Sequence, residues 1–386
     1  MYTRWREWVS DRWELSTLLG FGSGLLIVIA YLWRLGAKPF GASETNLVNS
    51  LSLQNIKDNP LNAPHNLLLL ALKHWHHAGP TGARLISVIF ALIIIVCFYL
   101  MVKFWLGRFG GWLGALMLSF TPLFMLAGRN AGNSLMVLLP IVSIVAYMWM
   151  LRGGKVSLWR LLALTLAAVL SAYSPGGLIV LIVGAIYERH NLAKLFKAAS
   201  TFSLAVNIVV LLALLTPIGW ASARHAATLE QFFLVPATWL GATVIVKSIG
   251  WSVLALFWHS STHHVLQVGQ LAILDATEIV LALFGFYALW SKAPKKLYPL
   301  IFIAACGVLA SAINQNYDLL LVCIIPILVV AATGLRYLYL EWTRVFPRNP
   351  LPRGLALIIL VTVIVVHIAW GAHYSLTAWP HSLPVR

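Results

Sequence analysis

The chain has 386 residues, of which 60% are apolar and only 10% are charged, and its formal net charge is +16. Ordinary soluble domains carry about 25% charged residues, so this composition argues against a soluble globular protein. The segment from Leu85 to Val102 carries no charged residue and approaches the ~20 residues that a helix needs to cross a bilayer. Similar segments recur to the end of the chain, which predicts an all-α polytopic membrane protein.

Eleven apolar segments follow one another in chain order. We expect them to form a bundle of about 11 transmembrane helices at residues 17–34, 84–102, 110–127, 134–151, 158–173, 176–187, 198–217, 273–290, 297–313, 319–338 and 354–372. Two longer polar segments, 35–83 and 218–272, interrupt this series. We expect both to be outer loops that contain interfacial helices.

The positive charges are distributed asymmetrically. If the N-terminus is cytoplasmic, most of the 27 Lys and Arg residues fall in short connections on the cytoplasmic side, as the positive-inside rule requires. The basic net charge is therefore a topology signal, and it does not indicate nucleic-acid binding. We expect a protein of the cytoplasmic membrane whose C-terminus and two long loops lie on the extracytoplasmic side.

Polar side chains gather on the predicted outer side. Ten of the twelve histidines lie on or near it, together with five of the 11 acidic residues, Glu44, Asp58, Glu230, Asp275 and Asp318. Such a one-sided distribution indicates a site that faces the exterior. Asp58 lies in the sequence IKDNP, where turn formation is the simpler explanation for an Asp.

The segment from Gly79 to Leu151 carries the most specific pattern. Arg84 opens an apolar span, LGRFGGWLGALMLSFTP leads into the next span, and AGRNAGNSLM starts a third. This pattern resembles the N-terminal half of the GT-C type membrane glycosyltransferases, a group that contains protein O-mannosyltransferases and lipid A aminoarabinose transferases. The resemblance extends over about residues 15–190. We therefore expect two parts, a GT-C-like module at residues 1–190 and a C-terminal transmembrane module at residues 191–386, with no separate soluble domain.

The resemblance implies an inverting transfer of a sugar from a polyprenyl-phosphate donor to a protein, lipid or glycan acceptor outside the membrane. Glu44 occupies the place of the family's acid on the first outer loop, and a carboxylate there can take the proton of an acceptor hydroxyl. Lys57 is a basic neighbour in sequence. The leaving group is a phosphate, so cations or a divalent metal would stabilise its charge. The resemblance implies no cofactor other than such a metal.

Three positions depart from the family pattern. The first acid of the usual Asp-Glu pair is Ser43, and the carboxylate expected a few residues after Arg129 is Asn133, which cannot act as a base. The Lys-Pro element of some members is Ala63 and Pro64, followed by His65. These changes leave two interpretations open: an altered active site, or an inactive relative that serves as a scaffold or lipid-sugar binder.

Other polar residues have two interpretations each. Arg129 either binds a donor phosphate, which its guanidinium fork matches, or anchors a helix end at the lipid headgroups. Tyr317 and Asp318 either line an outer cavity or begin a helix at which an Asp is favourable.

Histidines form two further clusters. His74, His76 and His77, together with the cluster from His259 to His264, suggest a metal site, although interfacial histidines explain them more simply. A transporter or flippase is a third functional hypothesis. It requires polar residues at mid-membrane, and His367 is the main candidate.

Overall fold

The computed structural model describes residues 20–75, 77, 79–152, 156–236, 238–260 and 266–381. Over these ranges the chain is helical apart from turns, loops and one isolated bridge between His259 and Leu271. Six helices are long and apolar enough to cross a membrane: Pro80–Phe120, Ser134–Arg152, Thr201–Arg224, Pro294–Asn314, Tyr317–Val345 and Pro350–His381. Four shorter apolar helices accompany them: Gly20–Leu32, Leu158–Ala172, Gly177–Tyr187 and Ala242–Phe257. The all-α membrane fold is confirmed, whereas these segments do not establish a number of eleven spans.

The remaining elements follow in chain order. The first polar loop forms α2 (Ala42–Ser50), α3 (Leu53–Asp58) and α4 (Ala63–His74). The next helices are α5 (Pro80–Phe120), α6 (Pro122–Arg129), η1 (Ser134–Leu138), α7 (Pro140–Arg152), α8 (Leu158–Ala172), α9 (Gly177–Tyr187), α10 (Arg189–Ala198), α11 (Thr201–Arg224), α12 (Ala226–Phe232) and α13 (Ala242–Phe257). The chain ends with α14 (Ala276–Lys292), α15 (Pro294–Asn314), η2 (Tyr317–Leu320), α16 (Leu321–Val345), α17 (Pro350–Ala372), η3 (His373–Ala378) and α18 (Trp379–His381).

The long helix α5 consists of two helical halves that fold back on each other. Its break is at Gly107, whose φ of 80° is a left-handed conformation that glycine adopts without steric cost. Gly114 lies against Phe98 and Val102, which are too far back along the chain to touch it within one straight helix. The two halves agree with the spans predicted at 84–102 and 110–127.

The core of the bundle lies around α5, α6, η1 and α16, whose side chains are mostly buried. Close packing of α14 against α16 depends on two glycines. A Cβ at Gly285 would lie 1.8 Å from the Val330 carbonyl oxygen, and one at Gly334 would lie 2.0 Å from that of Leu281. Such close backbone contact is how small residues bring membrane helices together.

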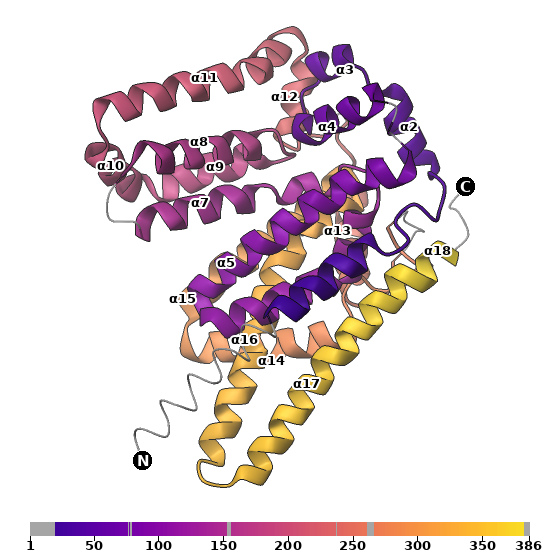
Figure 1. Ribbon diagram of the computed structural model, residues 1–386, viewed down its shortest axis with the longest axis vertical. Coiled ribbons are helices and arrows are strands. Elements are labelled where there is room, and N and C mark those ends of the chain that lie inside the picture. Colours follow the sequence, from indigo (N-terminus) through magenta and orange to yellow (C-terminus); the bar gives the residue numbers. More distant parts are fainter. Residues whose placement is uncertain are drawn as a thin grey trace.

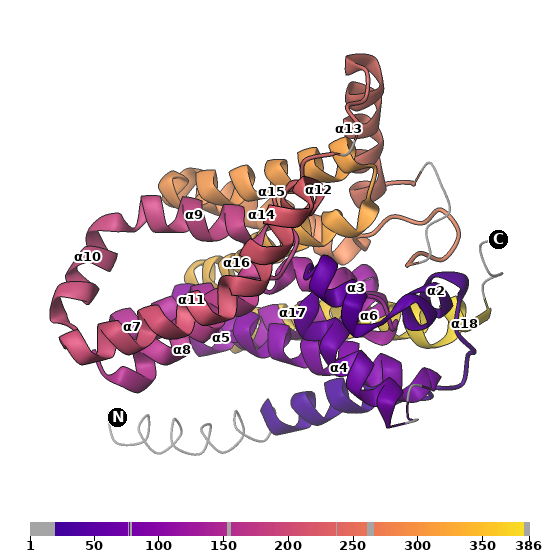
Figure 2. The same ribbon diagram turned by 90° about the horizontal axis from the view of Figure 1, so that it is seen from above.

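The two long polar segments meet at one end of the bundle. Figure 1 shows α2, α3, α4 and α12 gathered at the end opposite α10. Asn59 donates a hydrogen bond to Gln231 Oε1 at 2.8 Å, and the Thr228 hydroxyl donates to the Asp58 carbonyl at 3.4 Å. In Figure 2, α13 crosses the direction of the long helices, as an interfacial helix in the second segment would. The two segments thus lie on the same side, as predicted.

Candidate functional site

Glu44 forms a buried ion pair with Arg84. Arg84 Nε donates to Glu44 Oε1 at 2.9 Å, and Arg84 Nη2 donates to Oε2 at 2.7 Å. The other donors of the guanidinium bind the backbone carbonyls of Leu35, Lys38 and Pro39 at 2.7–3.0 Å. All five N–H donors of Arg84 therefore have acceptors. The arginine that opens the span thus holds the start of the first outer loop. Arg84, and not the sequence neighbour Lys57, is the basic partner of Glu44.

Both oxygens of Glu44 accept a second hydrogen bond. The backbone N–H of Ala131 donates to Oε1 at 2.8 Å, and that of Gly41 donates to Oε2 at 2.9 Å. Burial alone would raise the pKa of the Glu44 carboxyl, but Arg84 and the two backbone groups outweigh it and hold that pKa below its ordinary value. Glu44 is 2% exposed and lines neither of the cavities described below. Its role as a base stays a prediction, and these contacts favour holding the Ala131 turn in place.

Arg129 serves the end of the first described helix. Its Nη1 donates to the carbonyls of Ala30 and Tyr31, and its Nη2 donates to that of Trp33 at 2.7 Å. The last carbonyls of a helix have no partner within the helix, so Arg129 satisfies those of Gly20–Leu32. Its Nε has no hydrogen-bond partner among the described residues. The predicted contact with a donor phosphate stays a prediction.

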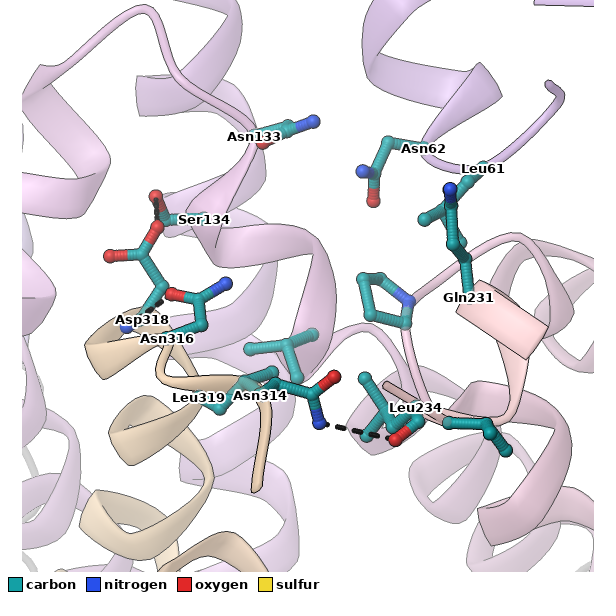
Figure 3. A pocket seen from close by; sticks show the side chains of 13 residues that line it. Leu61, Asn62, Asn133, Ser134, Gln231, Leu234, Asn314, Asn316, Asp318 and Leu319 are labelled. Atoms are coloured by element: carbon teal, nitrogen blue, oxygen red, sulfur yellow. Dashed lines mark hydrogen bonds between the residues drawn. The ribbon is translucent and has the colours of Figure 1, made fainter. Parts of the chain in front are cut away.

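Two cavities share one wall on the side of the polar loops. The smaller has a volume of about 280 Å³ and extends between η1, η2 and α12; the larger has about 710 Å³ and is lined by α2 and by the turn before η1. Asn133, Ser134 and Asp318 line both cavities. Figure 3 shows these three residues together on one side of the smaller cavity. Asn133 and Asp318, predicted as substrate-binding residues, thus line the same two cavities.

Asp318 is held in this wall by neighbours from two elements. It lies in the first turn of η2, where the Asn316 side chain accepts a hydrogen bond from its backbone N–H at 2.9 Å. The Ser134 hydroxyl at the start of η1 donates to Asp318 Oδ2 at 2.6 Å. The carboxylate is the charged side chain among the described residues that line the cavities. It can therefore accept a proton from a bound hydroxyl.

The other predicted site residues lie outside both cavities. His65 is fully buried in α4, with its Nε2 at 3.3 Å from the Ser87 hydroxyl, and burial lowers its pKa to about 4. Lys57 is exposed at the end of α3, and Asp58 beside it accepts two hydrogen bonds from Gln54 at 3.0 and 3.1 Å. Tyr317 packs against the hydrophobic core and does not line a cavity.

A second polar cluster was only partly anticipated. His367 Nδ1 lies 2.6 Å from Asp275 Oδ2, and its Nε2 lies 3.0 Å from the Met117 carbonyl oxygen. Glu278, which was not predicted as a site residue, forms a reciprocal cap with Asp275 and accepts a hydrogen bond from the Thr121 hydroxyl. The spacing of Asp275 and Glu278 is typical of a helix N-terminus, and it is the sequence signal that could have identified this pair.

The group of described residues that could hold a metal ion lines neither cavity. Of the described residues, Asp275, Glu278 and His367 form the one group whose donor atoms could converge on an ion. These atoms already bind one another, Thr121 and a backbone carbonyl. The cavity wall offers one carboxylate, Asp318, among amides and hydroxyls. His76, His263 and His264, which the sequence suggested as ligands, lie outside the described residues.

The sequence matches no protein-family model and no curated protein. Solved structures do resemble the fold. ArnT from Cupriavidus metallidurans in the apo state aligns with a TM-score of 0.58 at 13% identity, over 95% of this chain and 75% of that one. The same protein bound to undecaprenyl phosphate aligns with a TM-score of 0.52 at 12% identity, over 95% and 77%.

A second glycosyltransferase shares the arrangement. The oligosaccharyltransferase AglB from Archaeoglobus fulgidus, in complex with an inhibitory peptide and a dolichol-phosphate, aligns with a TM-score of 0.57 at 12% identity. That alignment covers 96% of this chain and 56% of AglB. ArnT and AglB are both GT-C glycosyltransferases. The chain therefore has the GT-C fold, as its resemblance to that family implied.

Proposed function

We propose that this GT-C-type membrane protein transfers a sugar from a polyprenyl-phosphate-linked donor to a hydroxyl-bearing acceptor at the extracytoplasmic face. One observation carries the proposal. Asp318, hydrogen-bonded to Ser134, lies in the wall that two cavities share. A transferase needs two substrates to meet at one proton acceptor, and this arrangement provides room for both. The complexes of ArnT with undecaprenyl phosphate and of AglB with a dolichol-phosphate support the choice of donor.

The transfer then proceeds through Asp318. An acceptor hydroxyl in the larger cavity gives its proton to the Asp318 carboxylate while its oxygen bonds to the anomeric carbon of a sugar in the smaller cavity. The bond between that carbon and the phosphate oxygen breaks, and its electron pair leaves with the phosphate. Attack from the opposite face inverts the anomeric carbon. Ser134 orients the carboxylate by its hydrogen bond at 2.6 Å.

Glu44 and Arg84 act on this site through the backbone. Glu44 Oε1 accepts from the N–H of Ala131, and the next residues, Gly132 and Asn133, line the larger cavity. The ion pair therefore positions the turn that carries part of the cavity wall. This role differs from the proton transfer that we predicted for Glu44.

The decisive experiment replaces Asp318 by Asn in proteoliposomes that contain a panel of polyprenyl-phosphate-linked sugars. A membrane extract supplies acceptors, and the release of free polyprenyl phosphate is measured. Loss of a general base slows transfer by ~10²–10⁴-fold. Asp58→Asn is a matched control, because Asp58 is a carboxylate of the same polar end that lines no cavity. Release at the normal rate by Asp318→Asn would refute the proposed role of Asp318.

One observation favours a second candidate function, a lipid-sugar binder without activity. The described residues that line the two cavities include no Lys, Arg or His to stabilise a departing phosphate. This candidate predicts that the wild-type protein binds a polyprenyl-phosphate sugar but releases no polyprenyl phosphate with any member of the panel.

A further inference from the structure

The smaller cavity is unusually rich in carboxamide groups. Those that line it are Asn62, Asn133, Gln231, Asn314 and Asn316. Figure 3 shows them on opposite sides of the cavity, with Asn62 and Gln231 on one side and Asn133 and Asn316 on the other. Each carboxamide offers a carbonyl oxygen that accepts and an NH₂ that donates. A ligand whose groups both donate and accept hydrogen bonds matches such a lining.

Asn62 has an unused acceptor inside the protein. Asn62 is 7% exposed, yet its side-chain oxygen Oδ1 has no hydrogen-bond partner among the described residues. Its backbone is held in a left-handed conformation with φ of 59°, and its N–H donates to the Tyr173 carbonyl at 2.8 Å. Leaving a buried polar atom without a partner costs free energy, so a ligand that donates to this oxygen would recover that cost. The side chain faces the cavity in Figure 3.

Two neighbouring amides are already held by hydrogen bonds within the protein. Gln231 Oε1 accepts from Asn59 at 2.8 Å, which leaves its NH₂ end for a ligand. The Asn314 NH₂ donates to the carbonyls of Leu234 and Ala310 at 3.1 and 3.0 Å, which leaves its oxygen as an acceptor. Side chains that are already oriented lose little conformational entropy on binding, which favours specific recognition.

The size and charge of the cavity restrict the ligand further. A volume of about 280 Å³ is near the lower end of the ~300–1,000 Å³ range of ligand pockets, which suits one small ring better than a chain. Val137, Leu234 and Leu319 provide apolar surface for the C–H groups of a ring. The charged side chain in the described lining is the Asp318 carboxylate, which repels an acidic ligand.

We propose that the smaller cavity binds a single sugar ring that carries no acidic group, and that Asn62 is a specificity-determining residue for its hydroxyl groups. This inference rests on the proposed function, because it assigns the transferred sugar to this cavity. A neutral hexose or pentose presents neighbouring hydroxyls that both donate and accept, whereas a uronic acid would bring its carboxylate towards Asp318.

Saturation-transfer NMR with free monosaccharides tests the inference without any lipid donor or acceptor. The full-length protein is placed in lipid nanodiscs free of glycoside detergents, and D-mannose, D-glucose, D-galactose, L-arabinose and D-glucuronate are titrated. At least one neutral sugar should bind, and D-glucuronate should bind at least about tenfold more weakly. Asn62→Gly removes the carboxamide but keeps the left-handed backbone, and it should weaken neutral-sugar binding about threefold to tenfold.

Two further variants complete the experiment. Asn349→Gly makes the same substitution at the start of α17, where the Asn side chain accepts from the Leu351 N–H, and it should leave sugar affinity unchanged. Gln231→Met removes a second carboxamide at nearly constant length and should also weaken binding, which keeps the test decisive if Asn62→Gly does not fold.

Three results would overturn the inference: no neutral sugar binds, D-glucuronate binds as tightly as the neutral sugars, or the folded cavity variants keep wild-type affinity. The outcome of the transfer assay is independent of the outcome of the sugar-binding experiment. Selective binding of neutral sugars by a protein that releases no polyprenyl phosphate would remove the proposed function and leave this inference standing. Transfer without discrimination between neutral and acidic sugars would support the proposed function and refute this inference.

Discussion

Replacement of Glu44 by Gln separates a structural role from a catalytic one. The substitution keeps the shape of the side chain but removes its charge, so Arg84, which is 1% exposed, remains a buried cation without a counterion. Breaking a buried ion pair by removing one partner costs about 3–5 kcal/mol. We therefore expect Glu44→Gln to lower the free energy of unfolding by about that amount.

A double-mutant cycle makes this expectation quantitative. Replacing both residues, as in Glu44→Leu with Arg84→Met, removes the uncompensated charge, so the double variant should be more stable than the sum of the single losses predicts. Unfolding by SDS in mixed micelles, followed by tryptophan fluorescence, measures each variant. Glu341→Gln is the control, because Glu341 pairs with Lys292 at the protein surface, where ion pairs contribute little.

The opposite outcome would support the base that we predicted from the sequence. If Glu44→Gln unfolds like the wild type but transfers sugar ~10²–10⁴-fold more slowly, the carboxylate acts on the substrate and the structural argument is wrong.

Three further predictions concern stability and topology. His65 has a pKa of about 4 in the folded protein against an ordinary 6.5, so the folded state binds fewer protons than the unfolded state. The free energy of unfolding should therefore fall by roughly 3 kcal/mol as the pH drops from 6.5 to 4. In a series of melting temperatures measured against pH, His65→Gln should remove this decrease. Arg129→Ala should lower the melting temperature, because three backbone carbonyls lose their hydrogen-bond donor, and it should leave the affinity for undecaprenyl phosphate unchanged. Lost affinity at an unchanged melting temperature would instead support the predicted phosphate contact. In a variant without native cysteines, a cysteine at Ser50 should react with an impermeant reagent from outside, whereas cysteines at Ser157 and Ser291 should not; the reverse pattern would invert the topology.

Hydropathy along the chain was sufficient to predict an all-α membrane protein and the positions of many of its apolar helices. Hydrophobicity is a local property, so a charge-free run predicts a membrane helix without knowledge of its neighbours. The predicted boundary between 84–102 and 110–127 agrees with the break at Gly107 for the same reason. The residues between Gly79 and Leu151 also indicated the GT-C fold, which the alignment with ArnT confirms.

Which polar residues lie next to one another depends on the packing of the helices. Glu44 was correctly selected as an unusual carboxylate, but its partner Arg84 lies 40 residues away. Ser134 and Asp318 are separated by 184 residues, and Asp275 and His367 by 92. Such pairs depend on how helices pack in three dimensions, and the hydropathy of each helix carries no information about its neighbours. For this reason the sequence predicted Glu44 and Asp318 on the same side of the membrane, whereas only the packed bundle distinguished the buried Glu44 from Asp318 at the cavity wall.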